Sequence, residues 1–293
     1  MVTAFAPPPP GRIASLEQGY ERQMRAKRAR AWLFFGLVLA AAAASAWMVE
    51  ADLPRLLRHI GTFTDYFDRI LKLDDGARVW TNPREWYWGL GKWSSLLLDT
   101  LLIAYLGTLF GGICGFLACF AASSNLMANR WIRGAARRFL EFCRTVPEIV
   151  FALIFVVAFG LGPIPGVLAI AIHTTGALGK LFSEVAENID MKPVDGLVST
   201  GASWPEVIRF AVVPQVLSNF ASYALLRFEV NVRGAAVMGF IGAGGIGQDL
   251  IEAIRKFYYS DVSAILGLII LTVVLIDLGT ERLRHALIGR EVR

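Results

Sequence analysis

Charged residues are scarce in this sequence. They make up 18% of its 293 residues, whereas a soluble domain carries roughly a quarter. Hydrophobic residues make up 55%, and they gather in long runs instead of following the periods of soluble helices and strands. The composition therefore excludes an ordinary soluble domain and favours a protein embedded in a lipid bilayer.

Cysteine is also rare, and the motifs of common enzymes are missing. The three cysteines, at positions 114, 119 and 143, have no C-x-x-C spacing, so we expect small packing residues and no metal site or disulfide. The sequence has no G-x-x-x-x-G-K-[ST] loop, no nucleophile elbow and no paired carboxylates. We therefore expect no catalytic residue and no ATP hydrolysis by this chain. The net charge of +5 lies mostly beside apolar runs, which indicates membrane topology and not nucleic-acid binding.

The sequence contains several long apolar runs. A bilayer core of ~30 Å takes about 20 apolar residues as a helix, and a backbone in lipid must satisfy its own hydrogen bonds. The runs predict an all-α, polytopic integral membrane protein with about six transmembrane helices. The expected spans lie at about 31–49, 95–122, 146–162, 166–182, from 211 onward, and 260–280. A Gly/Pro turn at 162–166 predicts that the third and fourth spans form a tight hairpin.

Arginine-rich segments predict the orientation of these spans, because short basic loops stay in the cytoplasm. We expect a flexible cytoplasmic tail over 1–30, a second cytoplasmic loop over 123–145, and a cytoplasmic C-terminus. Residues 50–92 form a long outer segment with tryptophans typical of a membrane interface. The chain thus divides into the tail 1–30, a region 31–92 with the first span, and a core 93–293 that contains a polar loop at 183–214.

The polar loop 183–214 has a regular internal pattern. Two short amphipathic segments flank Gly201, and Val194, Leu197 and Val198 give the first an apolar face. Ser203 fits an N-cap with Glu206 three residues later, which predicts a capping box. A second apolar face at 207–212 leads to Pro214. The pattern alone leaves two interpretations open, a rigid element that transmits force to a docked partner and a plain interfacial connector.

The same loop resembles the conserved cytoplasmic "EAA" loop of ABC importer permeases. Asp195-Gly196-Leu197 stand in the E-A-A places, while Gly201 and Pro214 match the family's glycine and proline at a spacing of 13. In this resemblance the coupling loop that contacts the ATPase comprises Asp195, Gly196, Gly201, Ala202, Ser203, Glu206 and Pro214.

The resemblance extends over roughly residues 90–290. The stretches TGASWPEVIRFAVVPQV and RFEVNVRGAAVMGFIGAGGIG look like the phosphonate-type ABC permease subunit. This implies a type I ABC importer permease fold in the cell inner membrane and a homodimer of permease chains. It also implies two ATPase subunits that hold ATP and Mg²⁺, so that this chain binds no cofactor. A periplasmic or lipid-anchored binding protein would deliver a phosphonate or a related phosphorus oxyanion.

Three charged residues lie inside the expected fifth span: Arg227, Glu229 and Arg233. A charge in the hydrocarbon costs at least a few kcal/mol, so these side chains should face protein or water. Glu229 and Arg233 have i,i+4 spacing and can pair. Either Arg227 or Arg233 meets the substrate oxyanion by bidentate hydrogen bonds, or the three residues form a structural ion-pair network. His173, with no carboxylate three or four residues away, is expected to be a packed polar residue.

The stretch GFIGAGGIGQDL contains Gly242, Gly244 and Gly247 in a G-x-G-x-x-G spacing. That spacing belongs to dinucleotide-binding proteins only when a strand precedes it and a helix follows it. Here a transmembrane span precedes it. We therefore predict a close-packed re-entrant bend at the outer end of the fifth span, with Gly242, Gly244, Gly245 and Gly247 near the translocation path.

Two other classes of function remain as alternatives to the ATP-driven importer of phosphorus oxyanions. An ABC permease for another small solute would share the same loop. A secondary transporter or a membrane-embedded enzyme is disfavoured, because the loop has a partner-coupling pattern and the sequence shows neither a proton-relay set in its spans nor a catalytic constellation.

Overall fold

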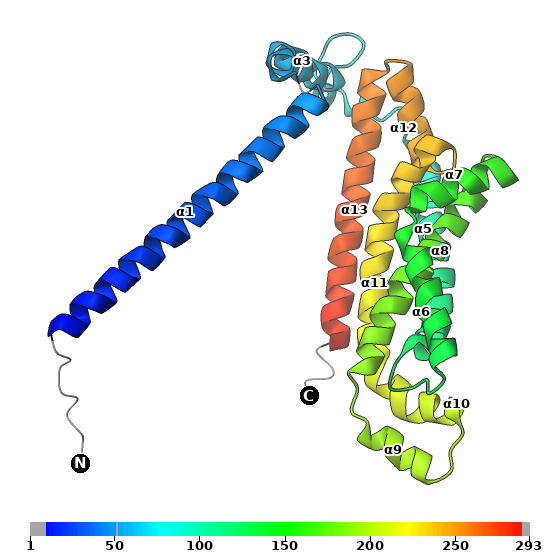
Figure 1. The fold of residues 1–293 in the computed structure, drawn as a ribbon. Helices are drawn as coiled ribbons and strands as arrows, with labels where there is room; N and C mark the ends of the chain where they lie inside the picture. The colour runs from blue at the N-terminus through cyan, green and yellow to red at the C-terminus, as the bar shows by residue number, and fades with distance from the viewer. Residues whose placement is uncertain (1–9, 51, 289–293) are drawn as a thin grey trace. The chain divides into compact units, whose positions relative to one another are not determined.

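The computed structural model describes residues 10–50 and 52–288, in which all elements of regular secondary structure are helical (Figure 1). In chain order the elements are α1 Pro10–Met48, α2 Leu53–Arg58, α3 Ile60–Ile70, η1 Val79–Thr81, α4 Pro83–Trp86, α5 Leu90–Ala122, α6 Arg130–Thr145, α7 Glu148–Phe159, α8 Pro163–Glu187, α9 Lys192–Ser199, α10 Trp204–Val207, the π-helical turn η2 Ile208–Val212, α11 Val213–Met238, η3 Gly239–Ile241, α12 Ile246–Arg255 and α13 Tyr259–Ile288. The all-α prediction is confirmed.

The chain divides between Asp65 and Tyr66 into two units. In the first unit, the stretch Gly19–Met48 of α1 is long and apolar enough to cross a membrane, which confirms the first expected span. The flexible tail expected over 1–30 is wrong for residues 10–30, which are helical. Proline is well placed at the start of a helix, and the glutamate, glutamine, arginine and alanine residues that follow have high helix propensity. Residues 1–9 of the expected tail lie outside the described part.

The second unit is a bundle built around α5, α8, α11 and α13. Helices α9 and α10 lie at one end of this bundle, and α7, η3 and α12 lie toward the opposite end (Figure 1). Three of these long helices meet the length and hydropathy of a membrane span, α5, α8 and α13. With α1 that makes four, and up to six when the two bent helix pairs of the described chain are each counted as a span. The expectation of about six spans is therefore confirmed.

Helices α5 and α8 approach each other closely because α5 carries a glycine every fourth residue. A Cβ atom added to Gly107 would lie 2.5 Å from Ile170 Cγ2, and one added to Gly111 would lie 2.6 Å from the Ala171 carbonyl oxygen. Gly115 meets the backbone of Gly179 in the same way. Lipid gives no hydrophobic drive for helix association, so such small-residue stripes let the backbones make van der Waals contact.

A cytoplasmic loop was expected over 123–145, but most of this segment forms helix α6. Residues 130–145 are helical, and Leu140 and Cys143 are buried on the face that packs against α8. Gly176 of α8 makes room for this contact, because a Cβ there would lie 2.5 Å from the Arg144 nitrogen. The arginines were counted as topology signals, but they are also compatible with an amphipathic helix whose apolar residues recur every three to four positions.

The expected third span is also corrected. Helix α7 has 12 residues, about 18 Å, which is too short to cross a bilayer alone. It continues from α6 through a bend of 84°. The hairpin predicted between the third and fourth spans is present as the turn between α7 and α8, where Gly160 and Gly162 have positive φ angles.

The tryptophans of the outer segment attach it to the start of α13. Trp86 Nε1 donates to Ser263 Oγ at 2.9 Å, and Trp88 Nε1 donates to Asp261 Oδ1 at 2.9 Å. Trp93 is buried at the start of α5. Asp261, the acid that followed the glycine motif in the sequence, therefore has a structural partner in this segment.

Candidate functional site

The loop before α11 folds as the two short helices that its pattern predicted. Asp195 and Gly196 lie in α9, and Gly201 takes a φ of +84° between α9 and α10. Only glycine adopts this conformation without strain, so Gly201 fixes the turn that reverses the chain. Ala202 and Ser203 follow the turn directly.

Glu206 caps the start of α10. Its Oε2 accepts from the Ser203 backbone nitrogen at 2.7 Å and from the Ser203 hydroxyl at 2.6 Å. Pro205 occupies the first turn, where its missing N–H leaves no donor unsatisfied. The predicted capping box is confirmed, and it holds α10 rigidly against the turn.

The helix pair is anchored to the bundle by apolar side chains. Val194, Val207 and Val212 are buried in one core cluster with residues of α5, α8 and α11. Trp204 Nε1 also donates to the Leu126 carbonyl oxygen at 3.0 Å. Val198 differs from the expectation, because 57% of it is exposed and only two of the three residues of the predicted α9 face contact the core. The helix pair thus has an inner face anchored in the core and an exposed outer face, an arrangement suited to the docking of a second protein.

Helix α11 begins where the fifth span was expected to begin. The helical path runs from Trp204 to Ile241 through the π-helical turn η2. Pro214 follows this turn in the first turn of α11. A proline removes one backbone donor, and a π turn is a common local adjustment in which helical bonding shifts by one residue. The start of α11 at Val213 therefore agrees with the fifth span expected from 211 onward.

Arg233 is the better compensated of the two arginines in α11. Its Nη2 lies 2.7 Å from Glu229 Oε1, as the i,i+4 spacing predicted, and 2.7 Å from Asp277 Oδ2 of α13. Arg284 Nη2 of α13 approaches Glu229 at 3.9 Å. This cluster joins α11 to α13 with two arginines and two carboxylates.

Arg227 belongs to a separate cluster that the sequence did not reveal. Its Nη2 lies 3.7 Å from Glu148 Oε2 of α7 and at hydrogen-bond distance from His173 Nδ1 of α8. Glu148 and His173 are 3.8 Å apart. The carboxylate near His173 comes from another helix, so no local spacing could have placed it there.

A buried amide lies one turn beyond Arg227. Asn231 Nδ2 donates to Thr108 Oγ1 at 2.8 Å and to Thr174 Oγ1 at 2.9 Å, which links α11 to α5 and α8. Its Oδ1 is buried without a partner among the described residues. An asparagine and two threonines inside apolar runs were the sequence signal for this network, because polar side chains in lipid bond across helices.

The glycine stretch forms the bend that was predicted, at the end of α11 opposite α9 and α10 (Figure 1). Gly242, Gly244 and Gly245 have φ angles of +84°, +86° and +80°. A Cβ atom at Gly247 would lie 2.1 Å from the Ala236 carbonyl oxygen. The bend turns the chain by 48° into α12, and the Gly162 nitrogen donates to the Gly242 carbonyl oxygen at 3.0 Å.

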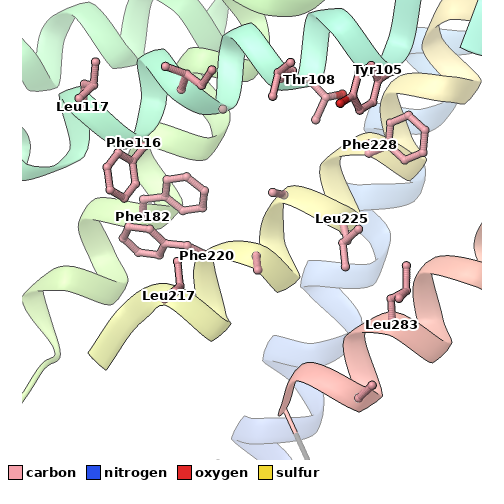
Figure 2. Close-up of a pocket in the computed structure, with 16 residues that line it drawn as sticks. Tyr105, Thr108, Phe116, Leu117, Phe182, Leu217, Phe220, Leu225, Phe228 and Leu283 are labelled. Atoms are coloured by element: carbon pink, nitrogen blue, oxygen red, sulfur yellow. The ribbon is translucent and has the colours of Figure 1, made fainter. Parts of the chain in front are cut away.

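One cavity of the second unit is apolar. It has about 900 Å³ and lies among α5, α8, α11 and α13. Figure 2 shows the rings of Phe116, Phe182 and Phe220 gathered on one side, with Tyr105 and Phe228 further along. Apart from the hydroxyls of Tyr105 and Thr108, its lining side chains are apolar. This lining offers an oxyanion no cationic side chain and few donors, whereas Arg227 offers a guanidinium.

A smaller cavity of about 460 Å³ lies near α9, between the end of α8 and the start of α11. It is lined partly by polar side chains, including Glu184, Asp190 and Gln215. Within the described ranges, no group of three or more His, Cys, Asp and Glu residues could hold a metal ion. The candidate site therefore consists of the α9–α10 pair, the two charged clusters and the glycine bend.

The sequence pattern of the family described as "Binding-protein-dependent transport system inner membrane component" matches residues 107–290. The chain is 39% identical to the phosphite transport system permease protein PtxC of Stutzerimonas stutzeri over 196 residues, or 67% of this chain and 71% of that protein. It is 32% identical to the phosphate-import permease protein PhnE of Mycolicibacterium smegmatis over 246 residues, or 83% of this chain and 44% of that protein. It is also 52% identical to the putative cryptic phosphonate transport system permease protein PhnE2 of Escherichia coli over 117 residues, or 40% of this chain and 96% of that protein.

Solved structures share the fold at low sequence identity. The MetNI methionine ABC transporter in an inward-facing conformation superposes with a TM-score of 0.58 at 17% identity, covering 67% of this chain and 95% of the other. A bacterial ABC transporter involved in the import of alginate gives a TM-score of 0.58 at 12% identity, covering 85% and 98%. At these identities the likeness shows the fold alone, which is the one expected from the resemblance.

Proposed function

Because the chain belongs to the family of binding-protein-dependent transport system inner membrane components, we propose that it is the membrane-spanning permease subunit of an ATP-driven importer for a phosphonate or a related phosphorus oxyanion. The observation that carries the substrate class is the identity to permeases named for phosphite, phosphate and phosphonate. Phosphite and phosphate are small tetrahedral anions, and a phosphonate group offers the same charged oxygens.

The energy comes from a separate ATPase subunit in this proposal, since the chain has no phosphate-binding loop of its own. Two copies of the chain form the pathway, two ATPase subunits hold ATP and Mg²⁺, and a binding protein delivers the anion. The α9–α10 pair is the docking element for the ATPase. Its capped start, glycine turn and buried inner face support this role, because a rigid element transmits a displacement that a loose loop would absorb.

The orientation of the chain follows from this role. Docking of a cytoplasmic ATPase places α9 and α10 on the cytoplasmic side. Both termini are then cytoplasmic, and the glycine bend marks the outer mouth of the pathway. The many arginines of α6 are consistent with the same orientation.

The two charged clusters have different roles in the pathway. Arg233 is structural, because two carboxylates at 2.7 Å from its Nη2 already compensate its charge. Arg227 meets the substrate oxyanion, because no carboxylate among the described residues lies within hydrogen-bond distance of it. A guanidinium can bind two phosphoryl oxygens at once.

The test is purification of the full chain with its ATPase and binding protein, followed by measurement of ATP hydrolysis in proteoliposomes. Phosphite, phosphate, methylphosphonate, sulfate and glycine betaine are added separately. The proposal expects the ATPase subunit to co-purify and one of the phosphorus oxyanions to stimulate hydrolysis. Stimulation by sulfate or glycine betaine alone would make the chain a permease for another solute, and failure of any ATPase to co-purify would overturn the importer assignment.

A further inference from the structure

The charge of Arg227 is only loosely compensated within the chain. Glu148 Oε2 lies 3.7 Å from its Nη2, beyond the 2.7–2.9 Å, roughly, of a charge-assisted hydrogen bond. Arg233, two turns further along the same helix, has two carboxylate oxygens at 2.7 Å. Arg227 therefore has an anion nearby that is attracted to it but not bound by its donors.

The other polar neighbours of Arg227 are not carboxylates. His173 Nδ1 lies at hydrogen-bond distance from Arg227 Nη2. Thr174 Oγ1 accepts from Nε at 3.4 Å. The side chains of Arg227 and Glu148 are 16% and 27% exposed, so the pair is not sealed from molecules that enter between the helices.

The place of the Glu148 carboxylate depends on a glycine. A Cβ atom on Gly234 of α11 would lie 2.6 Å from Glu148 Oε1. This contact is with the flexible end of a side chain and not with backbone. Glu148 can therefore rest against α11 only because residue 234 has no side chain, and it can leave without moving a helix.

We propose that Glu148 is the resident counterion of Arg227 and that the phosphorus oxyanion displaces it during transport. The inference rests on the proposed function. A guanidinium inside a membrane needs an anion at each stage. When the substrate binds, its oxygens take the free donors of Arg227, and the carboxylate swings away from Gly234. When the substrate leaves, Glu148 returns, so the site neither holds the anion tightly nor stays uncompensated.

The experiment measures how phosphite raises the melting temperature of the full permease–ATPase complex, without binding protein. A ligand that binds only the folded state stabilises it by RT ln(1 + [L]/Kd), so a tighter ligand gives the same rise in Tm at a lower concentration. In Glu148→Gln the competing charge is gone, so the phosphite concentration that produces a given rise in Tm should fall by about tenfold or more, the lower end of coupling between close charge pairs. Gly234→Ala keeps both charges but pushes the carboxylate aside, so it should shift the same way.

Two control variants separate the outcomes. Glu141→Gln removes an exposed carboxylate of α6 and should match the wild type, while Arg227→Gln should abolish the response. A wild-type response that is unchanged in both Glu148→Gln and Gly234→Ala would overturn the counterion exchange and leave the importer assignment intact. A wild type that responds to neither phosphite, phosphate nor methylphosphonate, and whose ATP hydrolysis they do not stimulate, would overturn both. If Glu148→Gln fails to assemble, Gly234→Ala decides.

Discussion

At the residue scale, Gly245 has two reasons to be glycine. Its φ is +80° and its ψ is −174°, a region that is essentially restricted to glycine and costs other residues roughly 1–3 kcal/mol. A Cβ atom there would also lie 2.4 Å from Thr100 Oγ1, and this same hydroxyl accepts from the Ile246 nitrogen at 2.9 Å. A side chain at this position would therefore strain the backbone and would also disturb the hydrogen bond between Thr100 and Ile246, which joins the bend to α5.

We expect Gly245→Ala to reduce uptake of the transported anion strongly, because the bend must shift away from Thr100. The measurement is uptake by cells that depend on this permease, with membrane levels of the protein checked by immunoblot. Gly279→Ala in α13 is the matched control, since its Cβ would meet no atom within 4 Å. Normal uptake by Gly245→Ala would show that the bend does not contribute to the pathway.

Local residue pairs were predictable from the sequence, and distant ones were not. The pair Glu229–Arg233 follows from a spacing of four residues within α11, and the pair Ser203–Glu206 follows from a spacing of three at the start of α10. Glu148, His173 and Arg227 lie on three different helices, so no spacing rule brings them together. His173 was expected only to be a packed polar residue, and its proximity to Glu148 of another helix could not be read from local spacing.

At the element scale, the α5–α8 interface depends on backbone contact. Gly111 and Gly112 are adjacent, but only Gly111 faces α8 at close range. A Cβ at Gly111 would lie 2.6 Å from the Ala171 carbonyl oxygen, whereas one at Gly112 would lie 3.7 Å from Leu178 Cδ1. The first is an overlap with backbone, and the second is an ordinary van der Waals contact.

Gly111→Ala should therefore destabilise the bundle by about 1–3 kcal/mol, as overpacking of a tight interface does. Gly112→Ala should leave stability unchanged or raise it slightly, because alanine favours the helix. Thermal unfolding of the two variants in the same detergent gives the comparison. Equal melting temperatures would contradict the close approach of α5 and α8.

The cap of α10 gives a second prediction at this scale. Glu206→Ala removes both hydrogen bonds to Ser203, and loss of a cap costs roughly 0.5–2 kcal/mol. We expect the start of α10 to loosen, so that anion uptake falls more than ATP hydrolysis in proteoliposomes. Glu281→Ala, which removes an exposed glutamate of α13, should keep uptake and hydrolysis in their wild-type ratio. A parallel fall of both activities in Glu206→Ala would indicate loss of assembly instead of loss of coupling.

Elements with a clear period were predictable, and α6 was not. The apolar runs of α5, α8 and α13 exceed the length that a bilayer needs, and the α9–α10 pair carries its own caps. In α6 the arginines dominate the composition, while the buried face consists of few residues such as Leu140 and Cys143. This buried face packs against glycines of α8, which lie in a different part of the sequence. The local sequence of α6 therefore gave no reason to expect that this face is buried.

At the scale of the whole molecule, the second unit has two structurally distinct ends. One end carries α9 and α10, and the other carries the glycine bend and the start of α13 (Figure 1). The outer segment is tied to this second end through Trp86 and Trp88. An importer orientation therefore requires that α9 face the cytoplasm and that the turn near Asp74 face the periplasm.

Membrane-impermeant maleimide labelling tests this orientation. In a background with Cys114, Cys119 and Cys143 replaced by alanine, Ser199→Cys places a thiol on α9 and Asp74→Cys places one in the outer segment, both at exposed positions. Intact spheroplasts should label Asp74→Cys and leave Ser199→Cys unlabelled, and inside-out vesicles should reverse the pattern, because the reagent cannot cross the bilayer. Labelling of Ser199→Cys in intact spheroplasts would place α9 on the outer face and would remove it from any contact with a cytoplasmic ATPase.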